Sequence, residues 1–215
     1  MVIKKGIYNL TFITNLTLEP FIDRKLRNQF KDMTLKVNTQ YISYNEIELE
    51  DNHGKIKNSD YIIVWLNLEK IIKNHFDILT RNYTNHNHML DELTLFSEQI
   101  MNCISTRTNC GMIWISFEDY YINDYPVLGR TFEGCYWIDR LNVRLFDKLT
   151  KIKNFISMID MKSICSSIGL KSVFSRRNKL HFNNPYTLEV NQMCVDEFIK
   201  QILIDNGQEM PGIRL

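Results

Sequence analysis

The sequence FITNLTLEPF, residues 12–21, joins an apolar run to a polar turn and then to a segment with helical spacing. The apolar run ends at Ile13, and Thr14 and Asn15 follow it directly. In open α/β sheets, reactive groups lie where a strand ends and the chain turns into a helix. Thr14 is therefore either a reactive hydroxyl or a residue that shapes the turn, and its residue type leaves both open.

Short apolar runs without alternation recur along the chain, and they predict strands that are covered on both faces. The predicted strands are residues 7–13, 34–37, 60–66 and 111–116, with a weaker one at 155–160. Apolar residues spaced three and four apart predict helices at 19–30, 67–81, 86–105, 137–151 and 187–204. This alternation predicts one α/β domain over residues 1–215, with a parallel sheet between two layers of helices. The polar stretch 48–60 is predicted to be a surface loop.

Charge and composition exclude several classes of protein. Lys and Arg number 26 and Asp and Glu number 25, so the chain has no electrostatic footprint for nucleic acid or a membrane surface. It has no apolar stretch of the ~20 residues that a membrane span needs and no N-terminal signal peptide. Its five cysteines are widely spread and form no CxxC motif, which is typical of reduced thiols. We therefore expect a cytoplasmic protein without a metal or cofactor.

Polar residues at the predicted strand ends contain the parts of a nucleophile–base pair. Thr14 supplies a hydroxyl, and His181, predicted to lie in a loop before the last helix, supplies an imidazole that could take its proton. Asn15, Asn67 or Ser116, each next to a strand end, could assist the oxyanion or bind the substrate. The alternative is that Thr14 is a turn residue and His181 an ordinary surface or core histidine.

Four segments carry a family resemblance: LTFITNLTLEPF (10–21), SDYIIVWLNLEKI (59–71), DYPVLGRTFEGCYWIDRLNVRLFDKL (124–149) and RNKLHFNNPYTLEVNQMCVDEFIKQI (177–202). In this order they resemble the N-terminal domain of FkbH-like proteins, which is similar to the SGNH (GDSL-like) hydrolases. The resemblance implies a three-layer, flavodoxin-like fold. It places Thr14 at the nucleophilic Ser, His181 at the catalytic His, and Asn178 at the Asp three residues before that His.

This chain departs from the family pattern at those same positions. The methyl group of Thr14 crowds an attack, and Asn178 lacks the negative charge that stabilises an imidazolium. The Gly-x-Asn-Asp stretch of SGNH hydrolases is absent around Asn67, and no Asp-x-Asp motif for an FkbH-type phosphatase domain occurs. We therefore expect a free-standing SGNH-like domain.

Two functional hypotheses follow. The first is an SGNH-like acyltransferase or esterase in a natural-product or related biosynthetic pathway, acting on a small-molecule ester or on an acyl group held by a carrier protein. The second is a catalytically silent module that docks a carrier protein or partner enzyme. The basic stretch SRRNK (175–179) could meet a phosphate or an acidic carrier protein, or be a solvated loop. The aromatic stretch DYYINDY (119–125) could line a pocket or pack a turn.

Overall fold

The structure is a computed structural model, and it describes residues 6–71, 86–118, 132–169 and 172–207. Within these residues, parallel strands form one sheet in the order β2-β1-β3-β4-β5. The strands are β1 (Ile7–Thr14), β2 (Lys36–Ser43), β3 (Tyr61–Trp65), β4 (Gly111–Ile115) and β5 (Phe155–Ile159). This is the flavodoxin-like strand order, and its direction reverses between β1 and β3. The predicted α/β, flavodoxin-like fold class is confirmed.

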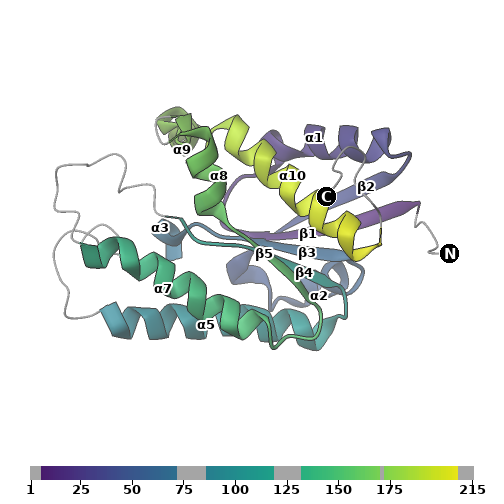
Figure 1. Cartoon of the computed structure of the whole chain (residues 1–215). Helices are drawn as coiled ribbons and strands as arrows, with labels where there is room; N and C mark the ends of the chain where they lie inside the picture. Colours follow the sequence, from purple (N-terminus) through teal and green to yellow (C-terminus); the bar gives the residue numbers. More distant parts are fainter. Residues whose placement is uncertain (1–5, 72–85, 119–131, 170–171, 208–215) are drawn as a thin grey trace.

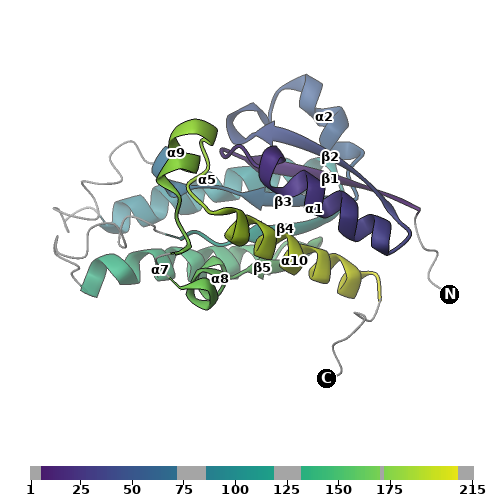
Figure 2. The same ribbon diagram turned by 90° about the horizontal axis from the view of Figure 1, so that it is seen from above.

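Helices cover both faces of the sheet (Figure 1). One face carries α1 (Glu19–Asp32), α8 (Met161–Ile168) and α10 (Leu188–Asp205), and the other carries α2 (Glu50–Lys57), α5 (His86–Arg107) and α7 (Phe132–Leu149). Successive residues of a strand point to opposite faces, so Phe12 enters the first core and Ile13 the second. In the view from above, α1 and α10 lie side by side (Figure 2), and Lys25 Nζ donates to the Gln192 carbonyl across 2.8 Å.

The edge strand β2 begins and ends later than the predicted strand at 34–37. Thr34 has a φ of 60° and Leu35 N–H donates to Phe30 O, so these two residues close the turn after α1. The strand then runs through the polar residues 38–40, which no apolar run marks. An edge strand has only one neighbouring strand, and its side chains here are mostly half-buried, which weakens the sequence signal.

The prediction of a surface loop over residues 48–60 is wrong, because α2 spans Glu50–Lys57 within it. Acidic residues occupy the first turn of α2 and lysines the last turn, an arrangement that favours the helix dipole. Ile56 is fully buried and anchors the helix to the second core. With only Asn52 and Ile56 buried, α2 has too small an apolar face to be recognised by periodicity.

The remaining helices differ from the predictions at their ends. The predicted helix at 67–81 begins as α3 (Leu68–Ile71), and residues 72–81 lie outside the described residues, as does the aromatic stretch 119–125. Helix α7 starts at Phe132, earlier than the predicted residue 137. The helices α8 and α9 (Arg176–Phe182) were not predicted, because each is short.

Candidate functional site

Thr14 is the last residue of β1, and its hydroxyl shapes the turn into α1. Its Oγ1 accepts a hydrogen bond from Leu16 N–H across 2.9 Å. The side chain is buried, with 5% of the residue exposed. This is the local side chain-to-backbone bond by which Ser and Thr stabilise turns. The hydroxyl proton is not used in this bond and stays available for donation.

Asn15 connects the ends of the two strands between which the strand order reverses. Its Oδ1 accepts from Asn67 N–H across 2.7 Å, and its Nδ2 donates to the Asn67 carbonyl across 2.9 Å. Asn67 is buried. The two candidate oxyanion residues are therefore brought together, with the Asn15 side chain bonded to the backbone of Asn67. An amide nitrogen has two N–H groups, so Asn15 retains one donor beyond this pair of bonds.

Ser116 lies one residue after β4, and it too bonds a backbone group. Its Oγ accepts from Met161 N–H, the first residue of α8, across 2.9 Å. Next to it, Asn142 of α7 binds both backbone groups of Phe117: Nδ2 donates to the carbonyl and Oδ1 accepts from N–H, each across 2.9 Å. Sequence reasoning missed Asn142. Its signal is its place on the apolar stripe of α7, four residues after Ile138 and three before Leu145.

Asn178 and His181 lie in α9, so the prediction of a loop at His181 is wrong. Ser175 caps this helix by accepting from Asn178 N–H across 3.2 Å, and the Asn178 side-chain amide donates to the Tyr186 carbonyl across 2.9 Å. His181 is exposed in the last turn, and its ring lies 6.4 Å from that of Phe182. Asn178 therefore fastens α9 to the segment that follows it.

Asparagines after α9 attach it to the turn that follows β1. Asn183 Nδ2 donates to Asn15 O across 3.2 Å, and Asn184 Nδ2 to Thr17 O across 3.4 Å. Asn184 is fully buried and also donates to Asn191 Oδ1 across 3.0 Å. Sequence reasoning missed this anchor. Its signal is Asn-Asn-Pro after a helical segment, because Asn tolerates the left-handed φ of 55° that ends α9 at Asn183.

The structure thus brings α9 to the end of β1 without closing a catalytic pair. Asn183, two residues after His181, contacts Asn15, the residue after Thr14. Among the described residues, no hydrogen bond joins Thr14 to His181 or His181 to Asn178. In the SGNH arrangement the imidazole must reach the hydroxyl before it can take its proton.

The buried cysteines offer no alternative nucleophile. Burial, together with the smaller effects of the charges of Glu118 and Asp160, raises the pKa of Cys165 to about 12. Burial also raises the pKa of Cys110 and Cys194. A thiol attacks as the thiolate, so these three groups are unreactive near neutral pH. In the described part of the chain there is no group of three potential metal ligands, and no helix there is long and apolar enough to cross a membrane.

Comparison with solved structures identifies the fold. The N-terminal part of the protein BF1531 from Bacteroides fragilis, described as containing a phosphatase domain complexed with Mg, superposes with a TM-score of 0.71 at 14% identity. The match covers 96% of this chain and 54% of that one, so this chain spans about half the length of that structure. The two chains share the three-layer α/β fold. The predicted resemblance to the N-terminal domain of FkbH-like proteins is confirmed for this fold.

A second match to a solved structure is weaker. The lipase Lip_vut3 from a goat rumen metagenome has a TM-score of 0.47 at 14% identity, over 89% of this chain and 97% of the lipase. No protein-family model matches this sequence, and no curated protein matches it either. The comparisons therefore establish the fold and leave the activity to the site itself.

Proposed function

We propose that this chain is a catalytically silent SGNH-like module that docks an acidic protein partner, for which an acyl carrier protein is the class suggested by the family resemblance. The observation that carries the proposal is that the expected catalytic groups form hydrogen bonds to the backbone. Thr14 Oγ1 bonds Leu16 N–H, and the Asn178 amide bonds the Tyr186 carbonyl. His181 is exposed on α9. Thr14 also stands in place of the family's Ser, and Asn178 in place of its Asp. This combination is expected of a domain that retains the fold and has lost the catalytic activity.

The docking surface in this proposal is α9. Residues 172–187 contain Arg176, Arg177 and Lys179 and no Asp or Glu. Arg176 and Arg177 are exposed, and within the described residues neither forms an ion pair with a carboxylate. Leu180 is 72% exposed and Phe182 41%, so large apolar side chains lie beside these cations. Arginines next to exposed apolar side chains are suited to an acidic partner, because opposite charge steers the encounter and apolar burial holds the complex.

A second candidate function is acyl transfer or ester hydrolysis on a carrier-bound thioester or small-molecule ester. The bond from Asn183 to Asn15 favours it, because it places the helix of His181 beside the turn of Thr14. Thr14 Oγ would attack the acyl carbon, and His181 would take the hydroxyl proton and return it to the leaving thiol or alcohol. The acyl group would then pass from Thr14 to an acceptor or water. A biosynthetic, cytoplasmic setting is common to both candidates.

Intact-mass spectrometry after incubation with a fluorophosphonate separates the two candidates. The proteins are the wild type, Thr14→Ser, Thr14→Ala and His181→Ala. A silent module gives no adduct in the wild type. A wild-type adduct that maps to Thr14, is lost in Thr14→Ala and requires His181 would overturn the proposal and establish the enzyme. An adduct only in Thr14→Ser would show that the remaining machinery works and that the threonine methyl silences it.

A further inference from the structure

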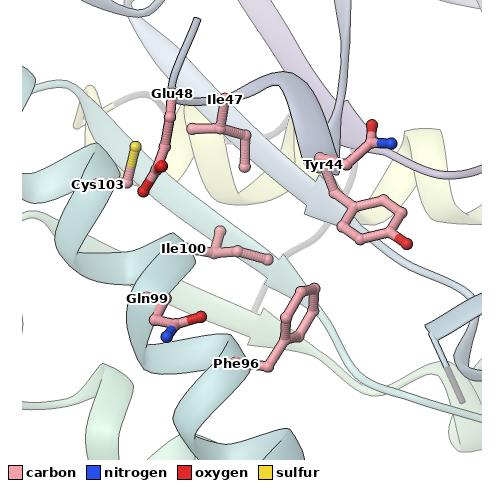
Figure 3. Close-up of a pocket in the computed structure, with 8 residues that line it drawn as sticks. Tyr44, Ile47, Glu48, Phe96, Gln99, Ile100 and Cys103 are labelled. Atoms are coloured by element: carbon pink, nitrogen blue, oxygen red, sulfur yellow. The ribbon is translucent and has the colours of Figure 1, made fainter.

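A pocket of about 200 Å³ lies between the segment that follows β2 and helix α5, on the face of the sheet that α5 covers (Figure 3). Tyr44 and Phe96 line one end, with ring centroids 5.5 Å apart in an edge-to-face arrangement. Glu48 and Cys103 line the other end. Ser43, which precedes Tyr44, pairs with Thr14 in the sheet, so the Tyr44 end of the pocket lies next to the carboxyl end of β2.

The pocket has one apolar end and one acidic end. Phe96, Tyr44 and the buried Ile100 supply apolar and aromatic surface, while Gln99 adds an amide. Among the described residues that line it, Glu48 is the one charged side chain. Glu48 belongs to the stretch NEIELED, residues 45–51, which carries four carboxylates and no Lys or Arg. The segment that forms one wall of the pocket therefore carries only negative charges.

The cations next to this pocket bond groups other than the Glu48 carboxylate. Arg107 donates to the Cys103 carbonyl across 3.3 Å and contacts the Cys103 sulfur. Lys55 donates to Asn52 Oδ1 across 2.9 Å. His53 Nε2 bonds the backbone carbonyl of Glu48 and leaves the Glu48 carboxylate to the pocket. No ion pair to Glu48 occurs within the described residues.

We infer that this pocket binds a small organic cation, an ammonium group on a short apolar or aromatic body. The ammonium lies at Glu48 and Gln99, and the body packs against Phe96, Tyr44 and Ile100. Aromatic faces attract cations as well as apolar groups, which adds to the match. The volume is below the ~300 Å³ at which pockets for drug-sized ligands begin, so the ligand is a small one. This inference goes beyond the proposed function and uses neither Thr14 nor α9.

Two probes with a similar phenyl body and opposite charge test the inference. Phenethylammonium and 3-phenylpropionate are titrated into the full chain, with binding followed by NMR shifts or calorimetry. We expect phenethylammonium to bind at this site, and Glu48→Gln to weaken it by about two- to five-fold, as expected for an exposed ion pair. Glu189→Gln is the matched control, since it removes the same charge from an exposed residue of α10 on the opposite face. No binding of the cation, equal binding of the anion, or equal weakening in both variants would overturn the inference.

Cys103 provides a second readout inside the pocket. It is half-buried, whereas Cys110, Cys165 and Cys194 are buried, so alkylation by N-ethylmaleimide at Cys103 can be followed by peptide mapping. We expect phenethylammonium to slow the labelling of Cys103 in the wild type, and to slow it less in Phe96→Leu, which keeps an apolar side chain in place. A labelling rate that the amine leaves unchanged would contradict binding at this pocket.

Discussion

The carboxyl ends of β1 and β4 are held by the same two kinds of hydrogen-bond arrangement, although only the end of β1 holds the predicted nucleophile. At each end a hydroxyl accepts a backbone N–H of the following turn or helix: Thr14 from Leu16, and Ser116 from Met161, both across 2.9 Å. At each end an asparagine also binds the N–H and the carbonyl of one residue, Asn15 at Asn67 and Asn142 at Phe117. A polar residue at a strand end is thus insufficient to indicate chemistry.

The two strand ends differ in what covers them. The asparagines that follow the short helix α9 bond the turn after β1, whereas Phe117 after β4 is bonded by Asn142 of the long helix α7. Helix α9 is basic and carries exposed apolar side chains, as a docking surface requires. In the proposed function, the turn after β1 is the attachment point of a binding surface.

The largest expected effect comes from detaching α9. Asn184→Ala removes the bonds to Thr17 O, Asn191 Oδ1 and Tyr186 N–H from a fully buried position. We expect the free energy of unfolding to fall by about 3 kcal/mol, because buried polar groups lose their partners. Urea denaturation measures this. Asn183→Gly is the control, since it keeps the left-handed backbone and removes one exposed bond, and an equal loss in both variants would contradict the account.

The next effect compares the two asparagines at the strand ends. Asn15→Ala and Asn142→Ala each remove two hydrogen bonds to backbone groups, and we expect each to cost about 2 kcal/mol in the same urea experiment. Asn38→Ala, which removes one bond between exposed side chains of β1 and β2, should cost less than about 0.5 kcal/mol. If Asn15→Ala were neutral while Asn142→Ala destabilised the protein, Asn15 would be held for a role other than stability.

The two hydroxyls should behave alike. Thr14→Val and Ser116→Ala each remove the acceptor of one buried backbone N–H, so we expect a loss of about 1 kcal/mol in each. Thr14→Ser keeps the acceptor and should leave stability nearly unchanged. Thermal unfolding of the three variants measures this, and a stabilising Thr14→Val would mean that the Thr14 hydroxyl is strained in the fold and kept for another purpose.

The smallest effect concerns Cys165 in α8, the helix whose first residue donates to Ser116. The pKa of Cys165 is about 12 in the folded chain, against an ordinary 9.0. The folded state therefore favours the neutral thiol, and this contribution is fully present below pH 9 and lost as pH rises from 9 towards 12. We expect the loss of this contribution to lower the free energy of unfolding by at most about 1 kcal/mol between pH 9 and 10. In Cys165→Ser, whose hydroxyl does not ionise in this range, the free energy of unfolding should fall less steeply with pH. Identical slopes in the two proteins would contradict the assignment of this pH dependence to Cys165.

The parts of the fold that the sequence predicted well are those with strong apolar patterns. The runs of β3 and β4 have no polar interruption and that of β1 is interrupted only by Asn9 and Thr11, so their positions and parallel arrangement follow from composition and alternation. Helix α9 could not be predicted because it buries none of its own residues and is fixed by Ser175 and the asparagines that follow it. Helix α2 could not be predicted for a similar reason, because Ile56 is its one buried apolar residue.

The candidate site was predictable in its position and not in its bonding. Thr14 ends β1, Asn15 follows it and Asn67 follows β3 at the same edge of the sheet, and the Asn15 side chain bonds the backbone of Asn67. Whether a hydroxyl accepts a turn N–H or approaches an imidazole depends on local backbone geometry, which residue types do not encode. Asn142 and Asn184 act through contacts with segments that are distant in sequence, so spacing along the chain does not reveal them.

The central claim, docking without catalysis, is tested most directly by titrating an acyl carrier protein carrying its phosphopantetheine arm against four proteins at low ionic strength. They are the wild type, Thr14→Ala, Arg176→Glu with Arg177→Glu, and Lys151→Glu with Lys153→Glu as a control pair at the opposite edge of the sheet. The account predicts that the α9 pair weakens binding by about tenfold or more, while the control pair and Thr14→Ala bind like the wild type. Equal binding by both charge-reversed pairs, or loss of binding in Thr14→Ala, would contradict it.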